Sequence, residues 1–282
     1  MWKVNLLVGL LSLGWCTAVG QANYHPQDSI KVETLLHQVE QGVSSAEKLV
    51  WFGKSLQETP YVGGTLEDSV EVLTVNLRQL DCVTFVETAL ALTLASEWGG
   101  GWSDYLRALR LLRYRQGKVD GYASRLHYFT EWIYENENTQ RFVEEVTHRY
   151  ATGEASPRTL FFMSAHADAY PALKADSSQL QAIHQIEERL SRLPIIQLSK
   201  QQPDLQHRVE QLEAGSIVAF VTCIAGLDVT HVGIVIHREG KVCLLHASSR
   251  HRKVLIEPGT LYDYIRRQKG CTGIRVLRLA IP

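Results

Sequence analysis

The chain has little net charge, few cysteines and few prolines. Its 282 residues carry a formal net charge of −1 and include 5 Cys and 8 Pro. Without a strongly basic balance, we expect no nucleic acid partner. The sequence contains no C-x-x-C or H-E-x-x-H motif, so neither a metal ion nor a cofactor is expected. We also find no repeat and no low-complexity tract, which leaves the composition of an ordinary globular protein.

The first 22 residues form a segment of a different kind. Lys3 precedes an apolar run from Leu6 to Trp15, and small residues follow it, namely Thr17, Ala18, Gly20 and Ala22. This order is typical of a secretory signal peptide, cleaved after one of the last three. The run is short for a membrane span, so no stable membrane insertion is expected. Trp15 directly before Cys16 argues against a lipoprotein. We therefore predict export to the periplasm; an uncleaved N-terminal helix is the alternative.

Residues 23–282 are interpreted as one domain with helices first and strands afterwards. Apolar spacing predicts helices over residues 29–54, 82–95, 102–115, 127–136 and 177–193. Short runs rich in Val, Ile and Leu predict strands over residues 216–222, 231–237, 242–247, 253–256 and 273–279. This order favours an α+β fold in which a helical N-terminal half packs on a C-terminal antiparallel sheet.

Cys82 stands at the predicted start of a helix. Asp81 precedes it and is a good N-cap, because its carboxylate can accept hydrogen bonds from the first-turn N–H groups. A helix N-terminus favours an anion and can lower the pKa of a cysteine, which would make Cys82 the most reactive thiol near neutral pH. Taken alone, however, a buried core cysteine explains the pattern as well.

A predicted hairpin brings two histidines together. The turn Glu239-Gly240 would join two strands, and pairing Arg238 with Lys241 places Gly233 opposite His246. Side chains two residues apart share a face, so His231 and His246 become diagonal neighbours. A three-residue loop would instead place the two rings on opposite faces of the sheet.

Cysteine and two histidines can together perform nucleophilic catalysis. Cys82 would be the nucleophile, His231 its base, and His246 the residue that orients the base. A developing oxyanion also needs donors, for which the backbone N–H of Cys82 and the hydroxyl of Tyr61 are candidates.

Several motifs at this point resemble a known family. They are Tyr61-Val62-Gly63-Gly64, Asp81-Cys82-x-x-Phe85, His231-Val232-Gly233-Ile234 and Leu245-His246-Ala247-Ser248. Together they resemble the NlpC-type cell-wall cysteine peptidases, which are papain-like bacterial hydrolases. The runs 124–129, 170–173 and 226–229 are similar to one branch, the N-acetylmuramoyl-L-alanine amidase-like proteins. Val83-Thr84 follow the cysteine here, where the common NlpC pattern has Ser-Gly.

The resemblance implies a papain-like fold and a peptidoglycan substrate. The expected reaction cleaves the amide between N-acetylmuramic acid and L-Ala in small muropeptides, including 1,6-anhydro forms. A stem-peptide endopeptidase of the γ-D-Glu–diaminopimelate type and a non-catalytic muropeptide-binding protein are the alternatives.

Further residues are predicted to contact the substrate. Arg125 could pair with a substrate carboxylate, and His127 and Tyr128 could supply donors. Asp228, in the run 226–229, is the last candidate. The sequence leaves open the oligomeric state and whether Cys223 and Cys243 form a disulfide.

Overall fold

The computed structural model describes residues 22–68 and 70–281. The predicted signal peptide, apart from Ala22, lies outside the described residues. Ten α-helices are found in the described part: α1 (Pro26–Gln38), α2 (Ser45–Ser55), α3 (Cys82–Trp98), α4 (Trp102–Arg113), α5 (Phe129–Tyr134), α6 (Phe162–Ala165), α7 (Pro171–Ala175), α8 (Ser177–Leu190), α9 (Leu205–Glu210) and α10 (Leu261–Arg267). The strands are β1 (Asn23–Tyr24), β2 (Thr74–Val75), β3 (Val143–Glu145), β4 (Ser156–Pro157), β5 (Pro194–Ile195), β6 (Leu198–Ser199), β7 (Ile217–Thr222), β8 (Val229–Arg238), β9 (Lys241–Ser248), β10 (Lys253–Ile256) and β11 (Cys271–Leu279).

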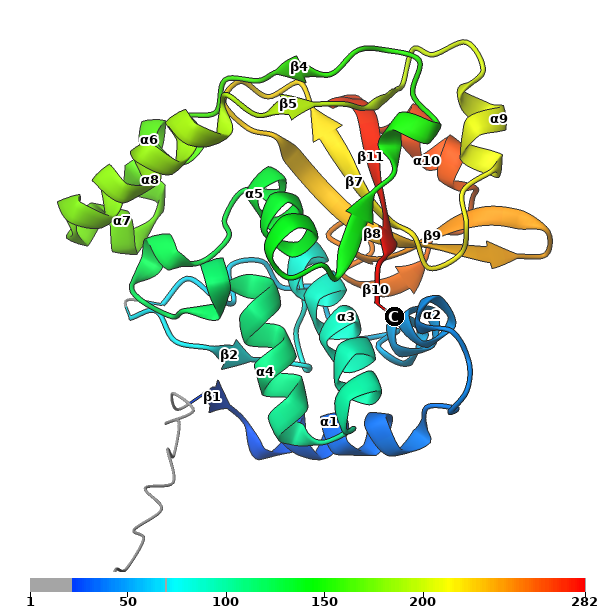
Figure 1. Cartoon of the computed structure of the whole chain (residues 1–282), viewed down its shortest axis with the longest axis horizontal. Coiled ribbons are helices and arrows are strands. Elements are labelled where there is room, and N and C mark those ends of the chain that lie inside the picture. Colours follow the sequence, from blue (N-terminus) through cyan, green and yellow to red (C-terminus); the bar gives the residue numbers. More distant parts are fainter. Residues whose placement is uncertain (1–21, 69, 282) are drawn as a thin grey trace, which may run out of the picture.

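One large sheet organises the C-terminal part of the chain. Its strand order is β10-β9-β8-β7-β11-β3, β6 also pairs with β11, and every one of these pairs is antiparallel. Helices α1 to α4 gather on one side of this sheet, and α9 and α10 lie at the other (Figure 1). This confirms the predicted α+β arrangement of a helical first half against an antiparallel sheet.

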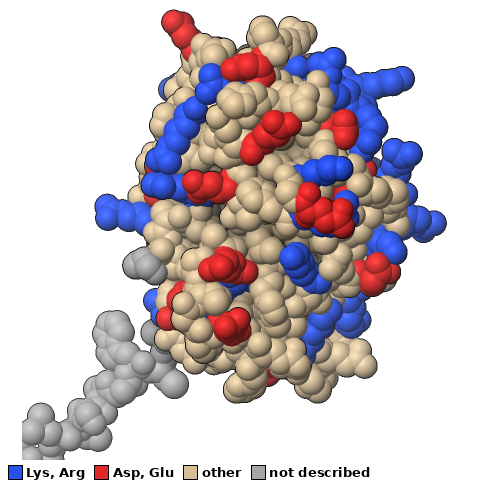
Figure 2. Space-filling model, turned by 90° about the vertical axis from the view of Figure 1, so that its right-hand side faces the viewer, with Lys and Arg blue, Asp and Glu red and all other residues tan. Residues whose placement is uncertain are grey.

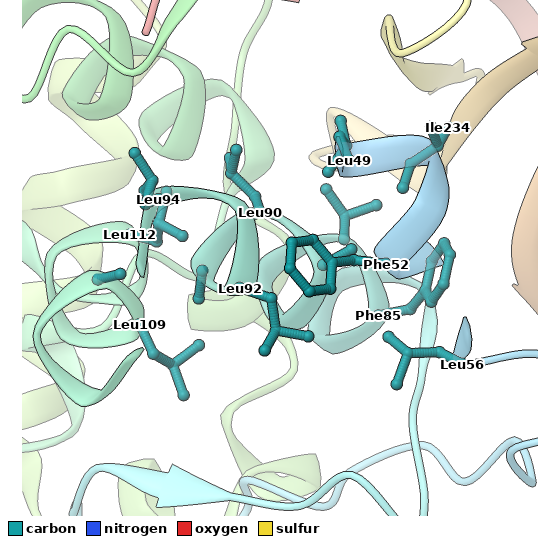
Figure 3. Close-up of a cluster of buried hydrophobic side chains, with 14 of the residues drawn as sticks. Leu49, Phe52, Leu56, Phe85, Leu90, Leu92, Leu94, Leu109, Leu112 and Ile234 are labelled. Atoms are coloured by element: carbon teal, nitrogen blue, oxygen red, sulfur yellow. The ribbon is translucent and has the colours of Figure 1, made fainter. Parts of the chain in front are cut away.

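The two faces of the sheet bury different sets of side chains. Ile234 and Leu245 face α2 and α3, where they join the main core that includes Phe52 and Phe85. Figure 3 shows part of this core, with side chains from α2, α3, α4 and β8 gathered in one cluster. Because α3 is covered on several sides, it is apolar around its circumference rather than along one stripe.

The opposite face of the sheet packs against α9 and α10. Val235 and Leu244 point to this side and meet Leu205 of α9 and Ile265 of α10 in a second core. Adjacent residues on β8 therefore belong to different cores, as the two-residue period of a strand requires. On the face drawn in Figure 2, charges of both signs are interspersed, in keeping with the nearly balanced composition.

The predicted long helix over residues 29–54 is wrong in one respect, because it is two helices. Gly42 has a φ of +81°, a left-handed conformation that interrupts the helix. Ser44 then caps α2, with its side chain accepting from the N–H of Glu47 and the Glu47 carboxylate accepting from the N–H of Ser44. Ser-x-x-Glu is a capping box that the sequence already displays.

The helix predicted over residues 127–136 also differs. It begins at Phe129 as α5 and continues as a single π-helical turn, Glu135–Thr139. Sequence reasoning missed α9 and α10, which are short and owe their stability to burial against the sheet. Among the residues that the structure describes, no helix is long and apolar enough to cross a membrane.

Candidate active site

Cys82 occupies the first position of α3. Asp81 is the N-cap, and its Oδ1 accepts a hydrogen bond of 2.8 Å from the N–H of Thr84. The Thr84 hydroxyl oxygen in turn accepts from the N–H of Asp81 at 2.9 Å. This reciprocal pair fixes the start of α3, and so it fixes the place of Cys82 as the sequence predicted.

The electrostatics of the thiol differ from the prediction. Burial, reinforced by the negative charge of Asp81, raises the pKa of Cys82 to about 12. Hydrogen bonds from the N–H groups of Val232, Cys82 and Val83 lower the pKa of the thiol, but their effect is smaller than that of burial. The expected lowering by the helix terminus is therefore wrong for the free protein, because desolvation outweighs the donors.

The β8–β9 hairpin has the predicted register. Arg238 pairs with Lys241 and Ile234 with Leu245, through a two-residue turn whose Glu239 and Gly240 both have positive φ. A Cβ on Gly233 would lie 3.1 Å from the Cβ of His246, so Gly233 lies beside that histidine.

The two histidine rings form a hydrogen bond. Nε2 of His231 lies 2.7 Å from Nδ1 of His246, and the rings are almost perpendicular at 82°. Burial and the neighbouring His246 lower the pKa of His231 to about 3, so its imidazole is neutral at pH 7. A neutral imidazole can accept a proton, as a general base must.

Cys82 approaches β8 next to His231. Its thiol is close enough to the N–H of Val232 for that group to lower the thiol pKa, and Val232 directly follows His231. Tyr264 lies in the same neighbourhood. Its ring is 5.9 Å from that of His231, and its pKa is raised mainly by burial, with smaller contributions from Glu257 and Cys82. In the described ranges, however, no hydrogen bond joins the Cys82 thiol to the His231 ring.

Tyr61 lies beside the start of α3. Two backbone hydrogen bonds hold its segment in place. The N–H of Val62 donates to the carbonyl of Leu80 at 3.1 Å, and the N–H of Tyr61 donates to the carbonyl of Arg252 at 2.9 Å. Burial, together with the neighbouring Asp81 and Cys82, raises the pKa of Tyr61 to about 12. The hydroxyl therefore keeps its proton at pH 7 and remains a donor.

A pocket of about 390 Å³ opens beside these residues. Asp81 and Val83, the chain neighbours of Cys82, line it together with Thr230, the neighbour of His231. The predicted contact residues Arg125, His127 and Tyr128 line it as well, whereas Cys82, His231, Tyr61 and Asp228 are not among its lining residues. The structure thus brings three of the predicted substrate-contact residues to one pocket whose wall includes both chain neighbours of Cys82.

Arg125 is not a free cation. Its guanidinium pairs with Glu67 at 3.0 Å and with Glu71 at 3.1 Å, and its side chain is 9% exposed. These two carboxylates hold the pKa of Arg125 above its ordinary value. Arg125 thus helps to shape the pocket wall, and a substrate carboxylate would compete with Glu67 and Glu71 for it.

The remaining predicted contact residues are already engaged within the chain. Nε2 of His127 lies 2.8 Å from the carbonyl of Tyr122, and the Tyr128 hydroxyl donates to Glu187 at 2.6 Å. Asp228 is buried, and its carboxylate accepts from the N–H groups of Thr130 and Val229 at 2.6 and 2.8 Å. Asp228 thus holds α5 against the start of β8, and its contact with a substrate stays a prediction.

Sequence reasoning missed Glu257. Its Oε2 lies 3.3 Å from Nε2 of His246, on the side of the ring away from His231. Glu257 directly follows β10, where Leu255 pairs with His246, so a correct β9–β10 register would have found it. Glu67 and Glu71, which engage Arg125, had no comparable signal in the sequence.

The other cysteines have no place in this site. The four described cysteines, Cys82, Cys223, Cys243 and Cys271, are free thiols, so the Cys223–Cys243 disulfide is not formed in the structure. Cys243 is buried, whereas Cys223 is exposed. Within residues 22–68 and 70–281, no cluster of three or more side chains could hold a metal ion.

Several solved structures are similar to this chain. The solved structure of an N-acetylmuramoyl-L-alanine amidase from Bacteroides uniformis is similar, with 33% identity and a TM-score of 0.78 over 84% of this chain and 99% of that chain. A Bacteroides fragilis protein described as a candidate xylanase shares 38% identity, with a TM-score of 0.74 over 81% of this chain and 99% of that one. A Legionella pneumophila protein of the DUF1460 family, 19% identical, shares the fold, with a TM-score of 0.70 over 90% of this chain and 95% of its own.

No curated protein matches the sequence. The family model described as AmiA-like, N-acetylmuramoyl-L-alanine amidase-like, matches residues 51–274, which include Cys82, His231 and His246. The chain therefore belongs to the N-acetylmuramoyl-L-alanine amidase-like family.

Proposed function

We propose that the chain is an exported cysteine amidase with a single papain-like domain. Its substrates would be small muropeptides, including 1,6-anhydro forms, cut between the lactyl carbonyl of N-acetylmuramic acid and L-Ala. The observation that carries the proposal is the His231–His246 hydrogen bond of 2.7 Å beside the N-terminus of α3, where Cys82 stands. Family membership implies a peptidoglycan substrate, and the pocket beside Cys82 supplies the space for it.

The reaction begins with the neutral forms of both groups. His231 takes the proton from the Cys82 thiol as the sulfur attacks the lactyl carbonyl carbon. The negative charge that develops on the carbonyl oxygen accepts hydrogen bonds from the N–H of Cys82 and the hydroxyl of Tyr61. His231 then gives its proton to the L-Ala nitrogen, and the C–N bond breaks to release the stem peptide.

Water completes the cycle. The acyl group remains on Cys82 as a thioester, and His231 removes a proton from the attacking water. Hydrolysis frees the sugar carboxylic acid and returns the proton to the thiol. No step needs an oxidant, a reductant or a metal ion.

Mass spectrometry of defined muropeptides tests this function. The mature protein is incubated with a reducing and a 1,6-anhydro muropeptide that carry the same stem peptide. We expect an intact stem peptide with a free L-Ala amine, abolished in Cys82→Ala and retained in Cys223→Ser, whose thiol is exposed and outside the site. Cleavage inside the stem would identify an endopeptidase, and binding without any release would contradict an enzyme.

A further inference from the structure

The hydrogen-bond chain from His231 does not end at His246. Glu257 follows β10, and its N–H donates to the carbonyl of Leu244 at 2.8 Å, which anchors it on β9 beside His246. The residue is almost completely buried, at 5% exposure. Oε2 faces Nε2 of His246 at 3.3 Å, and Oε1 accepts from Nη2 of Arg267 in α10 at 2.8 Å.

A carboxylate at this place decides where the histidine protons lie. An ionised carboxylate only accepts hydrogen bonds, so Nε2 of His246 must carry its proton. When His246 is neutral, its Nδ1 is then an acceptor, and Nε2 of His231 must donate across the 2.7 Å contact. The lone pair of His231 is thereby placed on Nδ1, the ring nitrogen that His246 does not occupy.

Without that carboxylate, the chain can run in the reverse direction. His246 with its proton on Nδ1 would donate to Nε2 of His231 and move the proton of His231 to Nδ1. The nitrogen that should act as base would then be a donor. The 2.7 Å contact is compatible with both directions, so Glu257 is the group that distinguishes them.

We propose that Glu257 is a positioning residue, which acts through His246 to hold the lone pair of His231 on Nδ1. The inference rests on the proposed function only in that His231 is the base for Cys82. Glu257 also supplies a negative charge near the imidazolium that forms when His231 takes the thiol proton.

The surroundings of the chain are consistent with this role. Tyr264 packs edge-on against His246 at 5.2 Å and is tilted against His231 at 5.9 Å, which restricts rotation of both rings. Arg267 and, at 3.8 Å, His251 are the other charged or titratable groups that face Glu257. His246 holds the pKa of Glu257 below its ordinary value, so the carboxylate is ionised at neutral pH.

Glu257→Gln tests this role directly, because Arg267 fixes the orientation of the new side-chain amide. A guanidinium only donates, so the single amide oxygen is drawn to Arg267 and the NH₂ group faces Nε2 of His246. This reverses the chain. In Glu257→Gln/Arg267→Met the amide can turn its oxygen to His246, which restores the original direction. Arg267 tolerates this change because its side chain is 48% exposed.

The primary measurement is the tautomer of each ring by ¹⁵N-imidazole NMR near neutral pH. We expect Nε2–H on His231 and His246 in the wild type, Nδ1–H on both in Glu257→Gln, and Nε2–H again in the double variant. The control is Glu58→Gln, which removes an exposed carboxylate that pairs with Lys253 of β10 at 2.8 Å. Unchanged tautomers in a folded Glu257→Gln protein would overturn the inference.

Kinetics provide the second readout. We expect kcat to fall by about 100–10,000-fold in Glu257→Gln, the contribution of general acid–base catalysis, with little change in KM, and to recover partly in the double variant. If circular dichroism shows that Glu257→Gln does not fold, Glu257→Asp replaces it. The shorter Asp side chain withdraws the carboxylate from His246, so wild-type tautomers in this variant would contradict the role of Glu257. The NMR result stands without turnover, so failure of the wild type to cleave any muropeptide would overturn the proposed function separately.

Discussion

The resting state of the Cys82 thiol is open to direct measurement. Its pKa is raised from the ordinary 9.0 to about 12, which lowers the thiolate fraction at pH 7 by ~1,000-fold relative to an ordinary cysteine. A thiolate of higher pKa is intrinsically more nucleophilic. With a Brønsted coefficient of about 0.4–0.5, its intrinsic rate constant is roughly 15–30-fold higher, which offsets part of that loss. The net expectation is a thiol that reacts about 30–60-fold more slowly with a small disulfide reagent.

The assay follows modification of each cysteine by peptide mass spectrometry from pH 5 to pH 10. Exposed Cys223 serves as an internal standard for reagent delivery. The rate at Cys82 should rise about tenfold per pH unit without a plateau below pH 10. Replacing His231 with Ala should change this profile little, because the free protein holds no ion pair.

The opposite profile would refute the reasoning. A rate that is high and flat between pH 5 and pH 8, and that collapses in His231→Ala, would mean a preformed thiolate–imidazolium pair. That result would restore the sequence-based expectation that Cys82 is the most reactive thiol. It would also show that the N–H groups of Val232, Cys82 and Val83 outweigh burial.

Two further predictions concern stability. Gly233→Ala should lower the free energy of unfolding by about 1–3 kcal/mol in urea titrations, because the new Cβ would lie 2.7 Å from Leu244 and 3.0 Å from the carbonyl of Leu245; an unchanged midpoint would mean that the hairpin relaxes freely. Arg113→Met should lower the free energy of unfolding by about 3–5 kcal/mol, because Arg113 and Glu87 form a buried ion pair at 2.7 Å and the change leaves the Glu87 carboxylate without its partner. Glu87→Gln/Arg113→Met should recover part of that loss, and a double variant as unstable as the sum of the single variants would contradict the pairing.

The parts of the site that the sequence predicted are those that local rules determine. Asp81 followed three residues later by Thr84 specifies a helix start, so the position of Cys82 was readable. Glu239-Gly240 between two alternating runs specifies a two-residue turn, and the turn fixes the register. The shared face of His231 and His246 follows from that register alone.

What escaped prediction depends on contacts between distant segments. Glu67 and Glu71 reach Arg125 from a loop more than fifty residues earlier, and no periodicity links them. The expected helix-terminus effect on Cys82 is a local rule, but the desolvation that overrides it acts on a half-buried thiol in the assembled fold. Pairwise geometry can thus be derived from patterns, whereas desolvation needs the assembled fold.

Asp81 acts both through a local rule, as a helix cap, and through its charge in the assembled fold. As the N-cap it stabilises the helix start that presents Cys82, and its negative charge at the same time raises the pKa of that thiol. In the proposed reaction the nucleophile is therefore activated only when His231 removes its proton during attack. A base that must act in the transition state needs its lone pair fixed beforehand, which makes the direction of the His231–His246–Glu257 hydrogen bonds matter more here than it would for a preformed ion pair.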